Sequence, residues 1–425
     1  MIVKKLIEKV EGEANLNFEF KEGKIAKVDI NFNIYRGIEE ILKGKPPRDA
    51  LVINPRVCGI CNHAHLIATV KALEDALQKS GVEFSISQKA KDIREFTLAC
   101  ELIQNHIKWL YLTIYPNIYN ILGLQRDDSF ALKASYMANS ITKVLAIFAG
   151  QWPHSSYAVI GGVTCDPTYL DIIQAQSYIE DAIRFFEKVV IGLSLDDYLS
   201  IKSVSNLDKL NGDFSKLLYL LGENGFAKRG KSFDRFISFS NSKISKKAKS
   251  IATTISKVDF KYIKEYSQDG SFAKGVVYKD KFFEVGPLAR AIINKEPIIK
   301  SLHKKYKDST LTRVYARVHE VALLLKYAKE LLKNLDITLP SCSLNSKIEL
   351  NNIQGIASVE AARGSLIHKV NIENGLIKEY SIITPTQWNL SNNGVAANAM
   401  LGLESQEIAS FIFRSFDVCS VCTTH

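Results

Sequence analysis

The longest patterned stretches of this chain place apolar residues three or four positions apart, which is the spacing of an amphipathic helix. Ile93, Phe96 and Cys100 begin one such stripe. The pattern predicts four long helices, over Lys89–Leu112, Ser129–Phe148, Tyr169–Ile191 and Leu311–Leu335. Asp308 and Ser309, just before the last of them, are typical of a helix N-cap. Four long amphipathic helices favour a helix bundle as the core.

Alternating, strand-like sequence gathers near the two ends of the chain. Leu16–Phe20 and Ile25–Phe32 flank a glycine turn and predict a β-hairpin. Strands are also expected over Ile356–Val359, His368–Ile372 and Ile377–Ile383, with Asn374-Gly375 as a hairpin turn. Shorter helices are expected over Gly37–Lys43, Leu66–Leu77 and Ser405–Arg414. The predicted fold class is α+β and mostly helical: a long-helix bundle core with small β-sheets from the N- and C-terminal segments.

The amino-acid composition argues against a nucleic-acid partner and against a membrane span. The 425 residues are 46% hydrophobic and carry a net charge of +10, much of it within Phe226–Ser250. A solvated, lysine-rich surface explains this excess better than a nucleic-acid site, because no nucleic-acid motif accompanies it. No apolar run is long enough to span a membrane, and the start of the chain does not resemble a signal peptide. We therefore expect a cytoplasmic protein with no nucleic-acid partner and no membrane span of its own.

Two paired-cysteine motifs lie at opposite ends of the chain. The first is Arg56-Val-Cys58-Gly-Ile-Cys61, and the second is Asp417-Val-Cys419-Ser-Val-Cys422. Two C-x-x-C pairs can supply four thiolates to one soft or borderline metal ion, such as zinc, nickel or iron in a cluster. If the pairs meet, residues 1–425 form one unit with its metal site between the two motifs.

The spacing alone leaves two interpretations of the four thiolates open at about even odds. One is a structural tetrathiolate, but the pairs of a zinc ribbon are normally separated by about 15–20 residues. The other is a catalytic metal centre. Cys58 and Cys61 precede a predicted helix, and a helix N-terminus favours the thiolate form that a metal needs.

Several further segments accompany the cysteine motifs in a fixed order. They are Glu11-Gly12, Tyr35–Gly44, Arg56–His65, Gly150–His154, Gly161-Gly162, Phe283–Ala289, Ala362–Gly364, Pro385–Asn389 and Asp417–His425. With these segments the chain resembles the large subunit of nickel–iron hydrogenases along essentially its whole length. The cysteine motifs have the forms R-x-C-G-x-C-x-x-x-H and D-x-C-x-x-C-x-x-H. The resemblance favours the catalytic centre over the structural one.

The resemblance implies a role for each matching residue. All four cysteines would bind nickel, and Cys61 and Cys422 would also bridge to an iron that carries CO and CN ligands. Glu11 would pass protons to and from the Cys419 thiolate, and Arg363 would lie over the open face of the metals. Glu39, His425 and the backbone of Ile382 would hold a magnesium or similar divalent ion. Residues expected around the metals are His65, Pro385, Thr386, Asp417, Asn105 and Ala362.

Some matching positions leave their role open. Asn105 stands where many family members have Asp, and Ala362 stands where many have Pro. His65, His106 and His154 match family positions, although each could equally be a buried core histidine. The other histidines, His63, His303, His319 and His368, are expected to be structural or exposed.

The expected reaction is the reversible heterolytic cleavage of H2 into protons and electrons, so H2 is an expected partner. Cys100, Cys165 and Cys342 are too few for an iron–sulfur relay, so electrons must leave through a partner. The resemblance implies that this partner is an iron–sulfur small subunit. Nickel-insertion factors and a maturation protease are expected during assembly. An alternative is an H2 sensor with the same site, and a structural tetrathiolate is the other. A non-catalytic relative like the homologous subunit of respiratory complex I is disfavoured by the four intact cysteines.

Overall fold

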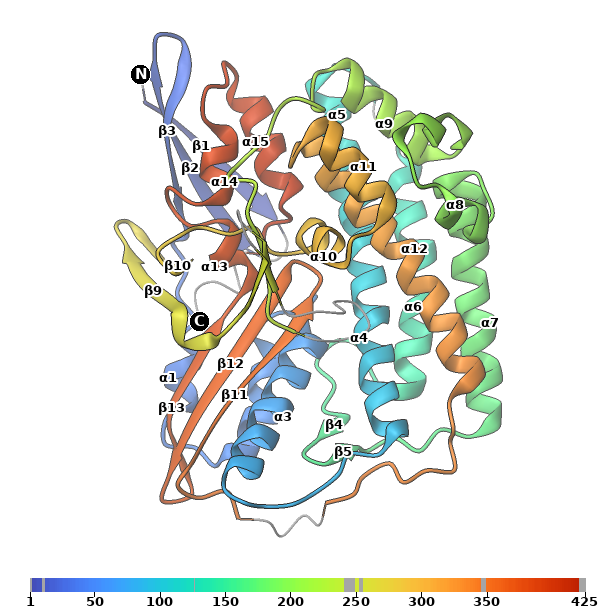
Figure 1. The fold of residues 1–425 in the computed structure, drawn as a ribbon, viewed down its shortest axis with the longest axis vertical. Coiled ribbons are helices and arrows are strands. Elements are labelled where there is room, and N and C mark those ends of the chain that lie inside the picture. Colours follow the sequence, from blue (N-terminus) through green and yellow to red (C-terminus); the bar gives the residue numbers. More distant parts are fainter. Residues whose placement is uncertain are drawn as a thin grey trace.

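The computed structural model describes residues 2–9, 12–125, 127–240, 249–251, 255–344 and 349–419. Figure 1 shows a helix bundle on one side of the molecule and a small antiparallel sheet with its covering helix on the other. Three residues with an expected chemical role, Glu11, Cys422 and His425, lie outside the described residues.

The bundle consists of the four long helices that the apolar pattern predicts. They are α4 (Gln88–Trp109), α6 (Ser129–Ala149), α7 (Tyr169–Phe185) and α12 (Thr310–Asn334). Both α6 and α12 contact α4 and α7, and π-helical turns over Leu110–Ile114 and Phe186–Ile191 extend α4 and α7. Ser309 caps α12 as expected, because its side chain accepts a hydrogen bond from the Thr312 N–H. No helix within the described ranges is long and apolar enough to cross a membrane.

The C-terminal sheet lies against the helix that follows the first cysteine pair. Its antiparallel strands are β11 (Ile353–Ala361), β12 (Gly364–Glu373) and β13 (Leu376–Ile383), and α3 (Asn62–Lys79) packs on β11 and β12. The packing is closest at Gly355, where a Cβ atom would lie 1.9 Å from the carbonyl oxygen of Ala72. Only glycine therefore lets β11 approach α3 this closely.

The N-terminal strands form a separate sheet with a covering helix of its own. β1 (Ile2–Lys9), β2 (Gly12–Lys21) and β3 (Lys24–Asn31) are antiparallel neighbours in that order. In Figure 1 this sheet lies beside α14 (Val395–Met400) and α15 (Gln406–Ser415), and α14 contacts β3. The short α1 (Ile38–Leu42) contacts β13. Segments from both ends of the chain therefore pack on one another.

Short elements that the apolar pattern does not reveal lie between these segments. The helices are α2 (Ala50–Ile53), α5 (Tyr115–Ile121), α8 (Leu195–Ser200), α9 (Asp213–Glu223), α10 (Pro287–Asn294), α11 (Pro297–Tyr306) and α13 (Pro385–Asn389). The strands are β4 (Ala158–Val159), β5 (Gly162–Val163), β6 (Phe236–Ser238), β7 (Lys249–Ile251), β8 (Ile255–Lys257), β9 (Ile263–Gln268) and β10 (Ser271–Tyr278). The predicted α+β class is confirmed, but sheets are not restricted to the two ends.

The contact between β11 and α3 predicts the effect of adding one methyl group. Gly355→Ala should lower the free energy of unfolding by at least about 1–3 kcal/mol, because backbone atoms must move to admit the Cβ. Gly222→Ala in α9 is the control: it has open space around it and should stabilise the helix by up to about 1 kcal/mol. Urea unfolding of both variants measures the difference, and equal midpoints would contradict the close approach.

Candidate metal centre

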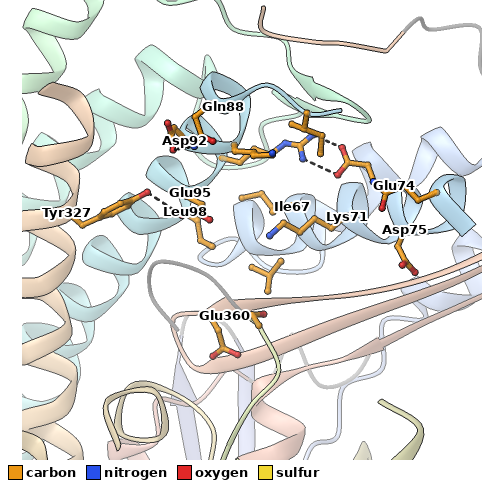
Figure 2. Close-up of a pocket in the computed structure, with 16 residues that line it drawn as sticks. Ile67, Lys71, Glu74, Asp75, Gln88, Asp92, Glu95, Leu98, Tyr327 and Glu360 are labelled. Atoms are coloured by element: carbon orange, nitrogen blue, oxygen red, sulfur yellow. Dashed lines mark hydrogen bonds and ion pairs between the residues drawn. The ribbon is translucent and has the colours of Figure 1, made fainter. Parts of the chain in front are cut away.

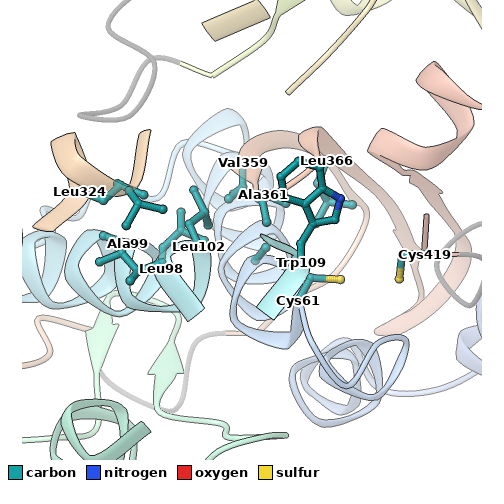
Figure 3. Close-up of a cluster of buried hydrophobic side chains, with 14 of the residues drawn as sticks. Cys61, Leu98, Ala99, Leu102, Trp109, Leu324, Val359, Ala361, Leu366 and Cys419 are labelled. Carbon is teal, nitrogen blue, oxygen red and sulfur yellow. The ribbon is translucent and has the colours of Figure 1, made fainter. Parts of the chain in front are cut away.

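Cysteines from opposite ends of the chain meet at one buried place. The Sγ atoms of Cys58 and Cys419 are 3.5 Å apart, and those of Cys58, Cys61 and Cys419 all lie within 4.8 Å of one another. The three residues are 1–5% exposed, and Figure 3 shows the sulfurs of Cys61 and Cys419 on the same side of the apolar cluster. Two thiolates bound at about 2.3 Å to one tetrahedral ion would be about 3.8 Å apart, so this spacing suits a shared metal.

Helix α4 holds the loop that carries Cys58 and Cys61. The Glu101 carboxylate accepts hydrogen bonds from the His63 and Ala64 N–H groups, at 2.7 and 3.2 Å. One helical turn further on, the Asn105 side-chain amide donates to the Ile60 carbonyl oxygen at 2.5 Å. A carboxylate at position 105 could not make this bond, because an ionised Asp has no proton to donate. Asn105 thus holds the loop at Ile60, the residue before Cys61.

Glu101 is a buried acid that sequence reasoning missed. Burial raises the pKa of its carboxyl to about 8, although the His63 and Ala64 N–H groups and the charge of Arg363 pull the pKa down. The available signal was an acid next to Cys100 in the apolar stripe of a buried helix. A residue of this kind needs partners, and Glu101 finds them at the N-terminus of α3.

Arg363 reaches the cysteines from a tight turn between β11 and β12. A Cβ atom on Gly364, whose φ is +134°, would lie 2.4 Å from Val285 Cγ2. A Cβ atom on Gly286, whose φ is +114°, would lie 2.7 Å from the carbonyl oxygen of Arg363. The two glycines let the turn pack directly against the segment before α10, and this contact fixes where the Arg363 side chain starts. Ala362, on the other side of Arg363, is fully buried.

Asp417 forms ion pairs with two buried arginines beside the cysteines. Arg363 Nε lies 3.0 Å from the carbonyl oxygen of Asp417 and 3.1 Å from its Oδ2, and Arg317 Nη1 donates to the same Oδ2 at 2.8 Å. Burial acts against the charge of Arg363, but Asp417 and the thiols of Cys419, Cys61 and Cys58 raise its pKa well above the ordinary value. A positive charge therefore stays beside the sulfurs.

A chain of buried polar groups continues from Arg317 away from the cysteines. His106 lies between Arg317 and Glu320, with Nδ1 3.4 Å from Arg317 Nη1 and Nε2 2.7 Å from Glu320 Oε2. Arg290 then bridges Glu320 and Glu360, at 2.7 and 3.0 Å. Burial lowers the pKa of His106 to about 4, so the ring is neutral near pH 7. Paired carboxylates and guanidinium groups thus brace α4, α10, α12 and β11 around the centre.

The threonine expected near the metals has an unused hydroxyl. Pro385 and Thr386 begin α13 and are both buried. The Thr386 hydroxyl is buried without a hydrogen-bond partner within the part of the chain that the structure describes. Buried hydroxyls normally have a partner, so this one fits a small polar ligand held at the centre.

Glu39 and Ile382 lie together, as the expected divalent-ion site requires. The Ile382 N–H donates to the Glu39 carboxylate at 2.6 Å, and Lys274 Nζ lies 3.8 Å from the other carboxylate oxygen. Burial raises the pKa of Glu39 above its ordinary value, whereas the Ile382 N–H and Lys274 lower it. A backbone N–H cannot bind a cation, so only the carboxylate and the Ile382 carbonyl are candidate ligands here.

The remaining histidines are mostly buried. His65 Nδ1 lies 3.1 Å from His368 Nε2, and His154 Nδ1 lies 3.0 Å from the Pro55 carbonyl oxygen. His63 packs edge-on against Trp152, and burial lowers its pKa to about 3. The expectation that His368 is structural or exposed did not foresee its contact with His65.

A cavity of about 390 Å³ opens between α3, α4, α12 and β11 (Figure 2). Its wall combines charged groups, among them Lys71 and Glu95, with the apolar side chains of Ile67, Leu98 and Val359. Leu98 and Val359 also belong to the apolar cluster that contains Cys61 (Figure 3). Apolar side chains are therefore shared between the cavity wall and the surroundings of the cysteines.

Comparison with known proteins identifies relatives over the whole chain. The sequence model of the nickel-dependent hydrogenase family matches residues 36–115 and 231–425. The periplasmic [NiFeSe] hydrogenase large subunit of Desulfomicrobium baculatum is 26% identical, over 98% of this chain and 93% of the relative. The hydrogenase-2 large chain of Escherichia coli (strain K12) is 23% identical, over 99% of this chain and 96% of the relative.

Solved structures show the same fold. The reduced Ni-Fe-Se hydrogenase from D. vulgaris Hildenborough superposes with a TM-score of 0.84 at 21% identity, and the match covers 100% of both chains. The reduced, active Ni-Fe-Se hydrogenase from Desulfomicrobium baculatum gives a TM-score of 0.82 at 22% identity, again over 100% of both chains. The arrangement of the bundle and sheets is therefore that of these proteins.

Removing the charge of Asp417 should destabilise the centre strongly. Asp417→Asn leaves Arg317 and Arg363 buried beside an amide, and loss of one partner of a buried ion pair costs about 3–5 kcal/mol. The exposed pair of Glu373 and Lys378 supplies the control, since Glu373→Gln should barely move the urea midpoint. Equal effects of the two changes would show that the arginines do not depend on Asp417.

Glu101 predicts a pH dependence of stability. Its pKa is about 8 in the folded chain against about 4.3 unfolded, so between these values the folded chain holds the extra proton and stability falls as pH rises. Glu101→Gln removes this contribution. The free energy of unfolding of the variant should therefore rise relative to that of the original chain as pH increases from about 5 to 8. Urea unfolding at several pH values measures the difference in free energy of unfolding between the variant and the original chain. The exposed Glu83→Gln change should follow the original chain, and parallel curves for Glu101→Gln would contradict the assignment.

Proposed function

This chain belongs to the nickel-dependent hydrogenase family, and we propose that it is the catalytic large subunit of a nickel–iron hydrogenase. The reaction is the reversible cleavage of H2 into two protons and two electrons. One observation carries the proposal: buried cysteines from opposite ends of the chain meet beside the buried guanidinium of Arg363. A purely structural metal knuckle would not need a fixed positive charge at its sulfurs.

The side chains present suit nickel and iron. Cys58, Cys61 and Cys419 supply soft thiolate ligands, and Cys422, three residues beyond the last described one, completes the proposed set. Bound nickel and iron would supply the electrophilic site at which H2 is polarised. The Thr386 hydroxyl has no hydrogen-bond partner among the described residues, and it would donate a hydrogen bond to a cyanide ligand on the iron.

The chain's own residues would manage charge and protons around that site. The Cys419 sulfur would accept and release a proton, and Glu11 would pass that proton on. Arg363, fixed by Asp417 and the glycine turn, stabilises negative charge at the sulfurs. Burial of the cysteines excludes bulk water, which strengthens each of these electrostatic contacts.

A divalent ion, magnesium or similar, is proposed at the Glu39 carboxylate. Ile382 would contribute its carbonyl oxygen and His425 its imidazole, and water would fill the other positions of an octahedral ion. The contact between Ile382 and Glu39 supports this site, because it holds the carboxylate at the edge of β13. Such an ion would tie the C-terminus to the sheet.

Electrons would leave through an iron–sulfur small subunit. Gly59, between the two cysteines of the first pair, is exposed although both neighbouring sulfurs are buried. Val52 is 46% exposed, and the exposed Arg56 donates to the Val52 carbonyl oxygen. An apolar and a basic residue therefore lie together on the surface, just before the first cysteine pair in the chain. A partner docked here would approach the metals closely, and this surface is the proposed small-subunit contact.

H2 would approach through the apolar side chains shared between the Figure 2 cavity and the Cys61 cluster. A maturation protease and nickel-insertion factors would act during assembly. A cytoplasmic location stays a prediction, since one relative is named as periplasmic.

Replacing a cysteine of the centre should remove nickel from the purified complex. Cys58→Ser and Cys419→Ser each delete one soft ligand, so both should lose nickel and H2 turnover. Cys342 is exposed and distant in sequence from both motifs, so Cys342→Ser should keep both. Mass spectrometry of bound metals, with H2 uptake as the second measurement, tests this. Zinc alone in the original complex would contradict the proposal and indicate a structural site.

A further inference from the structure

Building on the proposed function, we infer that His368 and Tyr380 are positioning residues for the metal centre that act through His65. They determine which ring nitrogen of His65 carries its proton. In the arrangement that the geometry favours, His65 is a neutral N–H donor toward the cysteine sulfurs.

The three side chains form one buried row that links α3 to the C-terminal sheet. His65 Nδ1 lies 3.1 Å from His368 Nε2, and His368 Nδ1 lies 2.8 Å from the Tyr380 hydroxyl. His65 is 1% exposed, His368 0% and Tyr380 4%, so bulk water does not compete for these bonds. His65 belongs to α3, His368 to β12 and Tyr380 to β13.

The neighbouring Thr69 hydroxyl is the more distant acceptor for the Tyr380 proton, at 3.3 Å against 2.8 Å for His368 Nδ1. The 3.3 Å contact is beyond the usual range of an O–H···O hydrogen bond, and the Thr69 oxygen accepts from Asn54 Nδ2 at 2.8 Å. Its own proton goes to the His65 carbonyl oxygen at 2.8 Å. His368 Nδ1 is therefore the well-placed acceptor for the Tyr380 proton within the described chain.

Each bond then fixes the next. If Tyr380 donates to His368 Nδ1, the His368 proton must sit on Nε2, because a neutral imidazole protonates one nitrogen only. His368 Nε2–H donates to His65 Nδ1, which leaves the His65 proton on Nε2. In the reverse arrangement the buried Tyr380 hydroxyl would donate across the longer 3.3 Å contact to Thr69, which is a weaker hydrogen bond.

The position of His65 near the cysteines indicates what its Nε2 proton does. Cys61 is the N-cap residue of α3, and its carbonyl oxygen accepts from the His65 N–H at 3.3 Å. His65 therefore lies one turn beyond Cys61, and helical side chains lean toward the preceding turn. An N–H group at the sulfur centre stabilises thiolate charge, whereas a bare ring nitrogen would direct its lone pair at an anion. Tyr380 thus influences the sulfurs through two imidazole rings.

The test uses a change that removes only one hydroxyl. Tyr380→Phe keeps the ring, but His368 Nδ1 loses its donor and should take up a proton that faces Thr69. His65 should then also switch its proton from Nε2 to Nδ1. Long-range proton–nitrogen NMR correlations of the full chain with 15N-labelled histidine identify the protonated nitrogen of each ring. His65→Gln and His368→Gln assign the two rings by loss of signal.

A second measurement separates this role from simple packing. In the nickel-loaded complex, Tyr380→Phe should shift the midpoint potential of the nickel signal to more negative values at unchanged nickel content, because the sulfurs lose an N–H donor. His368→Gln should keep the original potential, since its amide can accept from Tyr380 and donate to His65. Tyr198→Phe in α8, an equally buried tyrosine on the far side of the bundle in Figure 1, is the control and should change neither readout.

Retention of both protons on Nε2 in Tyr380→Phe, or an Nδ1 proton on His65 in the original chain, would overturn the inference. An unchanged midpoint potential in Tyr380→Phe would overturn it as well. The NMR readout does not depend on hydrogenase activity, so failure of the inference is distinguishable from failure of the proposed function.

Discussion

A group of cysteine sulfurs held together away from water needs positive charge and N–H donors around it, because anions are costly to bury without partners. In this protein the sulfurs of Cys58, Cys61 and Cys419 share that small space with the carboxylate of Asp417. Arg363 and Arg317 offset the charge directly. Since these groups come from opposite ends of the chain and from the middle, the centre forms only when distant segments pack together.

The architecture serves this requirement element by element. Helix α4 runs beneath the first cysteine loop and holds it through Glu101 and Asn105. The C-terminal sheet presents Arg363 at a turn whose two glycines permit direct backbone contact with the segment before α10. Helix α12 supplies Arg317 and, through Glu320 and His106, joins the centre to the rest of the bundle. Rigid elements on several sides thus position each group, as a preorganised metal site requires.

The regular elements of this arrangement could be predicted from the sequence. Long apolar stripes predict the four bundle helices to within a few residues, because burial of one helical face repeats at a fixed spacing. The paired cysteines and the segments that accompany them indicate the family and the residues of the centre. Short central elements such as α10 and β10 escaped prediction, since a few residues carry too little periodicity to be distinguished from loops.

Other features depend on distant contacts that no local pattern encodes. Glu101 looks like an ordinary helix residue until the N-terminus of α3 meets its carboxylate, and His368 looks like an ordinary strand residue until it meets His65. Glu11 and His425 are expected from the family resemblance, and Cys422 is expected from its spacing to Cys419 as well.

Whether the two cysteine motifs share one metal is the central question, and nickel X-ray absorption of the purified complex addresses it most directly. We predict nickel in a sulfur-dominated shell at about 2.3 Å, with an iron scatterer just beyond it. We also predict that Cys419→Ser removes nickel from the complex and with it this sulfur shell. Nickel surrounded by nitrogen and oxygen only, or a sulfur shell unchanged by that substitution, would contradict a metal shared by the two motifs.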